Sequence, residues 1–122
     1  MSVLVCVTGQ KSCERLIVAG AKIARAEGVI LNVLHVVRPD GNVLGFVNEP
    51  EALEYLLKVS VENGASMYVR RSDDVIGSIE YAARNEAASV IVAGRPPSYG
   101  GWDMLDELKL RLPGVRFEIL GA

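Results

Sequence analysis

The sequence predicts an α/β fold: a three-layer αβα sandwich, Rossmann-like, in which helices cover both faces of a five-stranded, mostly parallel sheet. Five short apolar runs alternate along the chain with stretches whose apolar residues recur every three or four positions. Several runs are apolar at consecutive positions, which is typical of strands buried on both faces. Alternating strands and helices require right-handed crossovers, and these place helices on both sides of the sheet.

The predicted strands are residues 3–7, 29–37, 65–69, 89–93 and 115–120. Every residue of the first strand is apolar, and most are β-branched. The fourth strand is apolar after its first residue. In the last strand, Phe117 and Ile119 alternate with Arg116 and Glu118, as expected of a half-buried strand.

Amphipathic helices are predicted between these strands. The first two end at Gly28 and Gly64, because glycine favours the left-handed backbone of a helix C-cap. Ser72 is the predicted N-cap of the third helix, which places Asp73 and Asp74 in its first turn. The fourth helix covers residues 104–112. The residues expected on the buried face of the second helix are Leu53, Leu56, Leu57 and Ser60.

Length and composition indicate a single domain that covers residues 1–122. Thirteen basic and fifteen acidic side chains give a net charge of −2, which provides no general attraction for nucleic acid or an anionic membrane. No apolar run approaches the roughly 20 residues of a membrane helix, and no secretory signal opens the chain. We therefore expect a cytoplasmic protein. The spacing of Cys6 and Cys13 matches neither a redox pair nor a zinc site.

The candidate ligand site lies at the carboxyl ends of the strands, where the crossovers change direction. In a sheet of this kind the first strand flanks that point, and the loops after the first and fourth strands are rich in glycine and small polar residues. The loop after the first strand also opens a helix, whose free N–H groups attract anions. The candidate ligand-binding residues are Thr8, Gly9, Gln10, Lys11, Ser12, Val37, Arg38, Gly94, Arg95 and Ser98.

The positions of the basic residues also favour a ligand site at the carboxyl ends of the strands. Lys11, Arg38, Arg70, Arg71 and Arg95 all follow the carboxyl ends of predicted strands in a chain that is acidic overall. Two interpretations stay open: a local positive rim that binds a phosphate or carboxylate, or arginines that are simply solvated.

The sequence contains no catalytic constellation. Ser12 and Cys13 lie at a helix start, where the helix dipole activates a thiol, but neither has an identifiable base. His35 lies within an apolar strand and is interpreted as a structural or pocket-wall residue. The segment from Gly9 to Ser12 lacks the spacing of a phosphate-binding P-loop, and no metal site is evident. We therefore expect a protein that is not an enzyme.

Several segments carry a family resemblance: VLVCVTG at 3–9, ERLI at 14–17, AKIA at 21–24, and residues 76–93 with the following Gly94 and Arg95. With these segments the chain resembles the universal stress protein family, and most of all the related domain of KdpD-type sensor kinases. The resemblance implies a sheet ordered 3-2-1-4-5 and a homodimer through the last strand, which runs from Val115 to Leu120. The glycine motif of the ATP-binding branch, laid on this sequence, agrees at Gly94 alone.

The leading hypothesis is a non-enzymatic stress-response or sensory domain that binds a small anionic ligand at the switch point. The alternative is an adenine-nucleotide-binding protein for AMP, ATP or cyclic-di-AMP. In that case the segment from Gly9 to Ser12 would hold phosphate, and Val37 and Arg38 would lie beside the base. An enzyme of phosphoryl transfer is the weakest hypothesis, because the candidate loops show no carboxylate pair for a metal ion.

Overall fold

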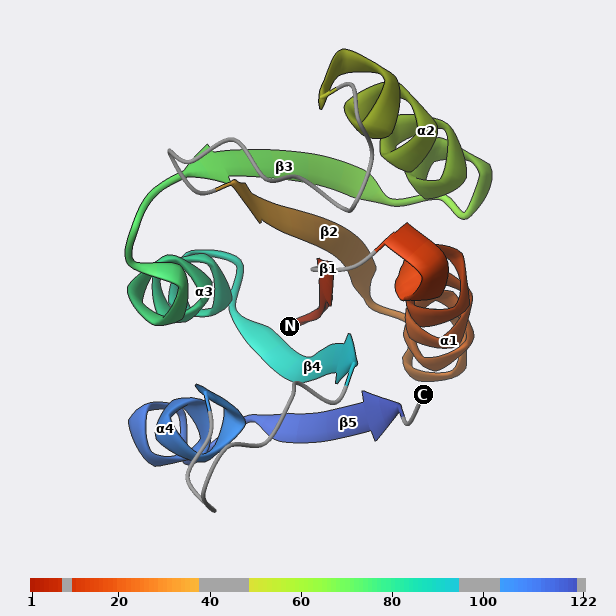
Figure 1. The fold of residues 1–122 in the computed structure, drawn as a ribbon. Helices are drawn as coiled ribbons and strands as arrows, with labels where there is room; N and C mark the ends of the chain where they lie inside the picture. The colour runs from red at the N-terminus through yellow and green to blue at the C-terminus, as the bar shows by residue number, and fades with distance from the viewer. Residues whose placement is uncertain (8–9, 38–48, 95–103, 121–122) are drawn as a thin grey trace.

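The computed structural model describes residues 1–7, 10–37, 49–94 and 104–120, in which strands and helices alternate (Figure 1). The elements are β1 (Ser2–Val7), α1 (Gln10–Glu27), β2 (Ile30–Val37), α2 (Glu49–Glu62), β3 (Ser66–Arg71), α3 (Val75–Asn85), β4 (Ala88–Gly94), α4 (Met104–Arg111) and β5 (Arg116–Leu120).

The strands form one parallel sheet with the order β3-β2-β1-β4-β5. In Figure 1, α1 and α2 cover one face of this sheet, and α3 and α4 cover the other. The predicted three-layer fold and its strand order are confirmed. Every residue of β1 is buried, which explains why this strand is apolar at every position after Ser2.

The sheet separates two hydrophobic clusters. Alternate side chains of a strand point to opposite faces, so Val3, Val5 and Val7 pack against α1 and α2. Leu4 and Cys6 face α3 and α4. The central strand therefore anchors both clusters and holds the two helix layers in place.

The first two helices end as predicted. Gly28 and Gly64 adopt φ values of 68° and 73°, in the left-handed region that favours glycine. In α1, Leu16 and Ile17 are buried while Lys22 and Arg25 are exposed, as the amphipathic pattern indicated. None of the described helices combines the length and the apolar character needed to cross a bilayer.

The start of α3 differs from the prediction. Asp74, and not Ser72, is the N-cap: its carboxylate accepts a hydrogen bond from the Gly77 N–H at 2.8 Å. The Ser72 hydroxyl accepts a hydrogen bond from the Asp74 N–H at 3.0 Å, in the turn that precedes the helix. The helix starts late because β3 continues to Arg71, and the Ser72 N–H still donates to the Val37 carbonyl at 2.9 Å. The first turn of α3 consequently contains no acidic residue.

The buried face of α2 also differs from the prediction. Leu56, Val59 and Ser60 are buried, whereas Leu57 is 49% exposed. Each helical residue is rotated by about 100° from the one before it. Positions 56, 59 and 60 therefore point to the sheet together, and position 57 lies on the flank of the helix. Leu57 was wrongly assigned because its size and hydrophobicity match those of Leu56.

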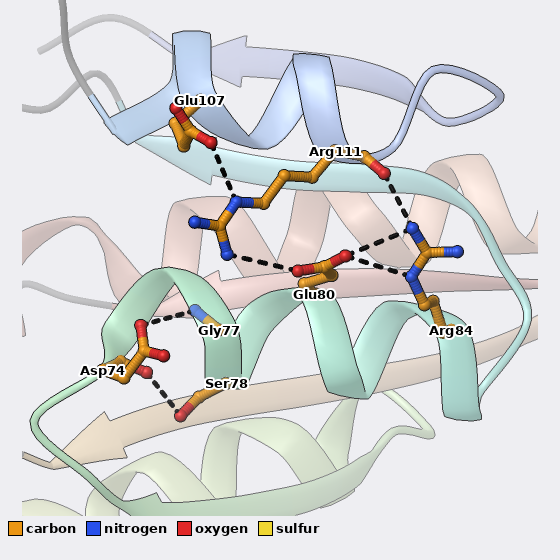
Figure 2. Close-up of polar contacts among 7 residues, drawn as sticks. All are labelled: Asp74, Gly77, Ser78, Glu80, Arg84, Glu107 and Arg111. Atoms are coloured by element: carbon orange, nitrogen blue, oxygen red, sulfur yellow. Dashed lines mark hydrogen bonds and ion pairs between the residues drawn. The ribbon is translucent and has the colours of Figure 1, made fainter.

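An ion-pair cluster joins α3 to α4 on the outer surface, as Figure 2 shows. Glu80 of α3 lies 3.2 Å from both the Arg84 and the Arg111 guanidinium groups. Arg111 also contacts Glu107 at 2.9 Å. Arg84 donates to the Arg111 carbonyl at 2.9 Å, which satisfies one free acceptor at the end of α4. The cluster supports the second helix layer, although exposed pairs contribute only about 0.2–1 kcal/mol each.

Candidate functional site

The candidate site begins where the crossovers reverse. The chain passes from β1 through α1 and α2 to β3 on one side, and α3 then returns it to β4 on the other side of β1. Cys6 and Ala93 are Cα partners in the β1–β4 pair, so Val7 and Gly94 end their strands side by side. The position of the switch point, between the first and fourth strands, is confirmed.

Half of the predicted site residues lie within the described part of the chain. Gln10 begins α1, and Lys11 and Ser12 follow in its first turn. Val37 ends β2 and is 1% exposed. Gly94 ends β4. The structure therefore brings the start of α1 and the ends of β2 and β4 to one edge of the sheet. The other predicted residues, Thr8, Gly9, Arg38, Arg95 and Ser98, lie outside the described ranges.

The amino end of α1 is the main electrostatic feature of this edge. The helix is 18 residues long and starts three positions after the last residue of β1, with no acidic residue in its first turn. The first N–H groups of a helix have no partner within the helix, and the helix dipole adds a partial positive charge there. This end of α1 therefore favours an anion over a cation.

His35 holds the end of β1. Its Nδ1 lies 3.1 Å from the Val7 carbonyl oxygen, and the side chain is 2% exposed. A carbonyl accepts only, so Nδ1 carries the proton and donates. His35 is also the Cα partner of Val7 in the β1–β2 pair. The imidazole thus orients the last peptide of β1, immediately before the candidate loop. The sequence did not indicate this partner.

The two cysteines are not candidate nucleophiles. Cys13 is fully buried in α1, and burial raises its pKa although it lies near a helix start. Cys6 is 5% exposed, and burial raises its pKa to about 12. A reactive cysteine must be a thiolate. Burial thus opposes thiolate formation at both cysteines, which argues against activation of Cys13 by the helix dipole.

On the α3–α4 face, a small cavity lies below the carboxyl ends of β1 and β4. Its volume is about 20 Å³, close to the space that a single water molecule needs. The lining is mostly apolar and includes Cys6, Gly94 and Met104. This cavity is too small for a nucleotide.

On the α1 face, an open groove of about 580 Å³ runs between α1 and the end of β5. Leu120 lines it and is the Cα partner of Gly94, so the groove starts at the carboxyl edge. The groove is shallow and open to solvent, unlike the concave pockets that bury most of a small molecule. The residues that line it are Glu14, Arg15, Val18, Ala19, Lys22 and Leu120. The sequence analysis did not place Arg15 or Lys22 at the candidate site.

Two arginines of the predicted basic rim lie away from the switch point. Arg70 and Arg71 do not follow β3 but form its last two residues, and β3 lies two strands from β1. The Arg70 guanidinium carbon lies 4.7 Å from the centroid of the Tyr81 ring, a cation–π contact with α3. These arginines therefore belong to the β3 edge and not to the switch point.

Comparison with known proteins was made at the levels of sequence and structure. No protein-family profile and no curated sequence matches the chain. Solved structures do match. A universal stress protein in complex with cAMP aligns with a TM-score of 0.69 and 14% identity, over 100% of this chain and 96% of that chain. The universal stress protein from Archaeoglobus fulgidus in complex with dAMP aligns with a TM-score of 0.63 and 19% identity, over 99% and 96%.

The chain has the universal stress protein fold. A cryptochrome from Synechocystis sp. PCC6803 also aligns, with a TM-score of 0.68 and 12% identity, over 99% of this chain and 27% of that chain. The fold therefore occurs in proteins of different function, and function has to be argued from the site.

Proposed function

We propose that this protein is a universal stress protein-like, non-enzymatic stress-response or sensory domain that binds an adenine nucleotide at the carboxyl edge of its sheet. One observation carries the proposal: the amino end of α1, which has no acidic residue in its first turn, lies at the switch point beside Gly94. The cAMP and dAMP complexes among the similar structures support it, because both ligands combine adenine with phosphate.

In this proposal each end of the nucleotide has its own contact. The first turn of α1, with Lys11 and Ser12, holds the phosphate, because free N–H groups and a cation stabilise the negative charge. The base lies beside the backbone at the end of β2, because the Val37 side chain is buried in the core. The candidate ligands are AMP, ATP and cyclic-di-AMP. Cyclic-di-AMP follows from the resemblance to KdpD-type kinase domains, which remains part of the proposal.

A thermal-shift titration with AMP, ATP, cAMP and cyclic-di-AMP tests nucleotide binding. A ligand at one hundred times its Kd stabilises the fold by about 2.7 kcal/mol, a readily measured shift. Lys11→Ala should weaken the binding at least tenfold, whereas Lys109→Ala, an exposed change on α4, should leave it unchanged. The absence of a shift with all four nucleotides would refute nucleotide binding. Equal affinities of the two variants would refute the assignment of the phosphate to Lys11.

The non-enzymatic part of the proposal rests on the state of the nucleophiles. Burial raises the pKa of both thiols, and the His35 Nδ1 proton is engaged with Val7. Incubation with ATP and Mg²⁺, followed by chromatography, should show no product above a protein-free control. Turnover that disappears in Lys11→Ala would overturn this part. We also propose a cytoplasmic location, which cell fractionation tests.

A further inference from the structure

Exposed aromatic, apolar and basic side chains gather where β3 forms the edge of the sheet. Tyr68 and Val69 of β3 are 44% and 40% exposed, and Arg70 beside them is also exposed. Tyr81 of α3 is 56% exposed, and Leu57 of α2 is 49% exposed. In Figure 1, α2 and α3 lie on opposite faces of the sheet. The strand and both helix layers therefore contribute, and we call these five residues the β3 surface.

Leu57 lies on the flank of α2 that faces away from α1. On the other flank, the Tyr55 hydroxyl donates a hydrogen bond to Glu14 of α1 at 3.3 Å. Two residues further along a helix correspond to a rotation of about 200°, so Leu57 points away from α1. Because β3 is the outermost strand and α1 packs on β1, this flank of α2 borders the outer edge of β3. A strand added to β3 would therefore contact Leu57 on one face and Tyr81 on the other.

The backbone of β3 also presents pairing groups to this edge. The Ser72 N–H donates to the Val37 carbonyl of β2 at 2.9 Å. In a parallel sheet the N–H and C=O groups of one residue point to one neighbouring strand, and those of the next residue point to the opposite side. The N–H and C=O groups of Met67 and Val69, an odd number of positions before Ser72, therefore point outward. No other described strand pairs with β3, and its segment SMYV at 66–69 lacks the proline, charge or bulge that usually protects an edge.

Arg70 is a preorganised cation on the β3 surface. Its guanidinium carbon lies over the Tyr81 ring, 4.7 Å from the centroid. The N–H groups of a guanidinium lie in its plane, so stacking on an aromatic face leaves them able to donate to both oxygens of a carboxylate. No carboxylate of the described residues pairs with Arg70, whereas glutamates pair with Arg84, Arg111 and Arg116. The β3 surface is thus complementary to an acidic partner at this position.

We propose that β3 binds an extended segment of a different protein as an additional, antiparallel strand, with an acidic side chain opposite Arg70 and apolar side chains opposite Val69 and Tyr68. Strand addition gains affinity from main-chain hydrogen bonds and selectivity from alternate side chains. In the antiparallel arrangement, Tyr68 and Arg70 fall in the pairs whose side chains lie closest, because their own N–H and C=O groups bond to β2. β3 itself contains no acidic residue, so a second copy of this strand would not supply the carboxylate.

An NMR titration of the isotope-labelled full chain with two blocked peptides tests the chemistry of the partner. The peptides SEVYVS and SKVYVS differ only at the residue that lies opposite Arg70. SEVYVS should bind at least about tenfold more tightly, because in SKVYVS repulsion replaces a charged hydrogen bond. Arg70→Glu should reverse this preference. Lys109→Glu, the same charge reversal on α4, should leave it unchanged. Circular dichroism establishes that both variants are folded.

Amide hydrogen exchange tests the addition of a strand. When SEVYVS is bound, the Met67 and Val69 amides should exchange at least about tenfold more slowly, because they gain hydrogen-bond partners. The Tyr68 and Arg70 amides, which already bond to β2, should change little. Absence of saturable binding, equal affinities for the two peptides, an unchanged preference in Arg70→Glu, or equal protection of all four amides would overturn the proposal. β3 signals that shift with protein concentration alone would assign the edge to a second copy and would overturn it as well.

Discussion

Gly20 determines how closely α1 approaches the sheet, and the structure predicts what a single added methyl group does there. A Cβ at this position would lie 2.5 Å from Val5 Cγ2 and 3.1 Å from Leu31 Cδ1. Carbon atoms in contact are normally about 3.5–4.0 Å apart, so the overlap with Val5 is about 1 Å. Val5 is fully buried and β-branched, which leaves it few ways to move. Overpacking costs about 1–3 kcal/mol, and the helix propensity of alanine offsets up to about 1 kcal/mol.

Gly20→Ala should therefore lower the free energy of unfolding by about 1–2 kcal/mol, measured by urea denaturation followed by circular dichroism. Gly114→Ala is the control, because a Cβ there meets no atom within 4 Å and should change stability by less than about 0.5 kcal/mol. Val5→Ala removes the clashing methyl groups. The double variant should lose less stability than the sum of the losses of the two single variants, with a coupling energy of at least about 1 kcal/mol. If the two single losses of stability add within about 0.5 kcal/mol, the contact with Val5 is not the cause of the cost of Gly20→Ala.

Further predictions concern the helix cap, the ion-pair cluster and the buried thiol. Asp74→Ala should lower the free energy of unfolding, measured by urea denaturation, by about 1 kcal/mol, because the N-cap hydrogen bond is lost. Asp73→Ala should lower it much less, and equal losses in the two variants would contradict the assignment of Asp74 as the N-cap. Glu80→Gln should cost up to about 1 kcal/mol in dilute buffer and less in 1 M NaCl, and a loss unaffected by salt would argue against ion pairing. The pKa of Cys6 rises from 9.0 in the unfolded chain to about 12 in the fold, so between these pH values the unfolded state binds fewer protons. Stability should therefore fall with pH above 9 more steeply in the wild type than in Cys6→Val, as urea titrations at successive pH values would show; identical slopes would contradict the raised pKa.

The local features of this protein are determined by its sequence. An apolar, β-branched run predicted β1, and glycines predicted the ends of α1 and α2, because each depends on residues a few positions apart. The place of the site was predictable for the same reason: the order of strands and helices dictates a parallel sheet, and parallel sheets bind ligands at their carboxyl ends. The strand order itself came from the family resemblance and not from local pattern.

Only the tertiary structure decided which groups meet across the sheet. Leu56 and Leu57 have the same side chain, yet packing buries one and leaves the other about half exposed. The pairing register with β2 places Arg70 and Arg71 within the edge strand, away from the candidate site. His35 received its partner because β1 and β2 align it with Val7, residues 28 positions apart in the chain. A local sequence pattern shows how often buried positions recur along the chain. It does not show which residue of a distant segment each side chain contacts, because those contacts form only in the folded structure.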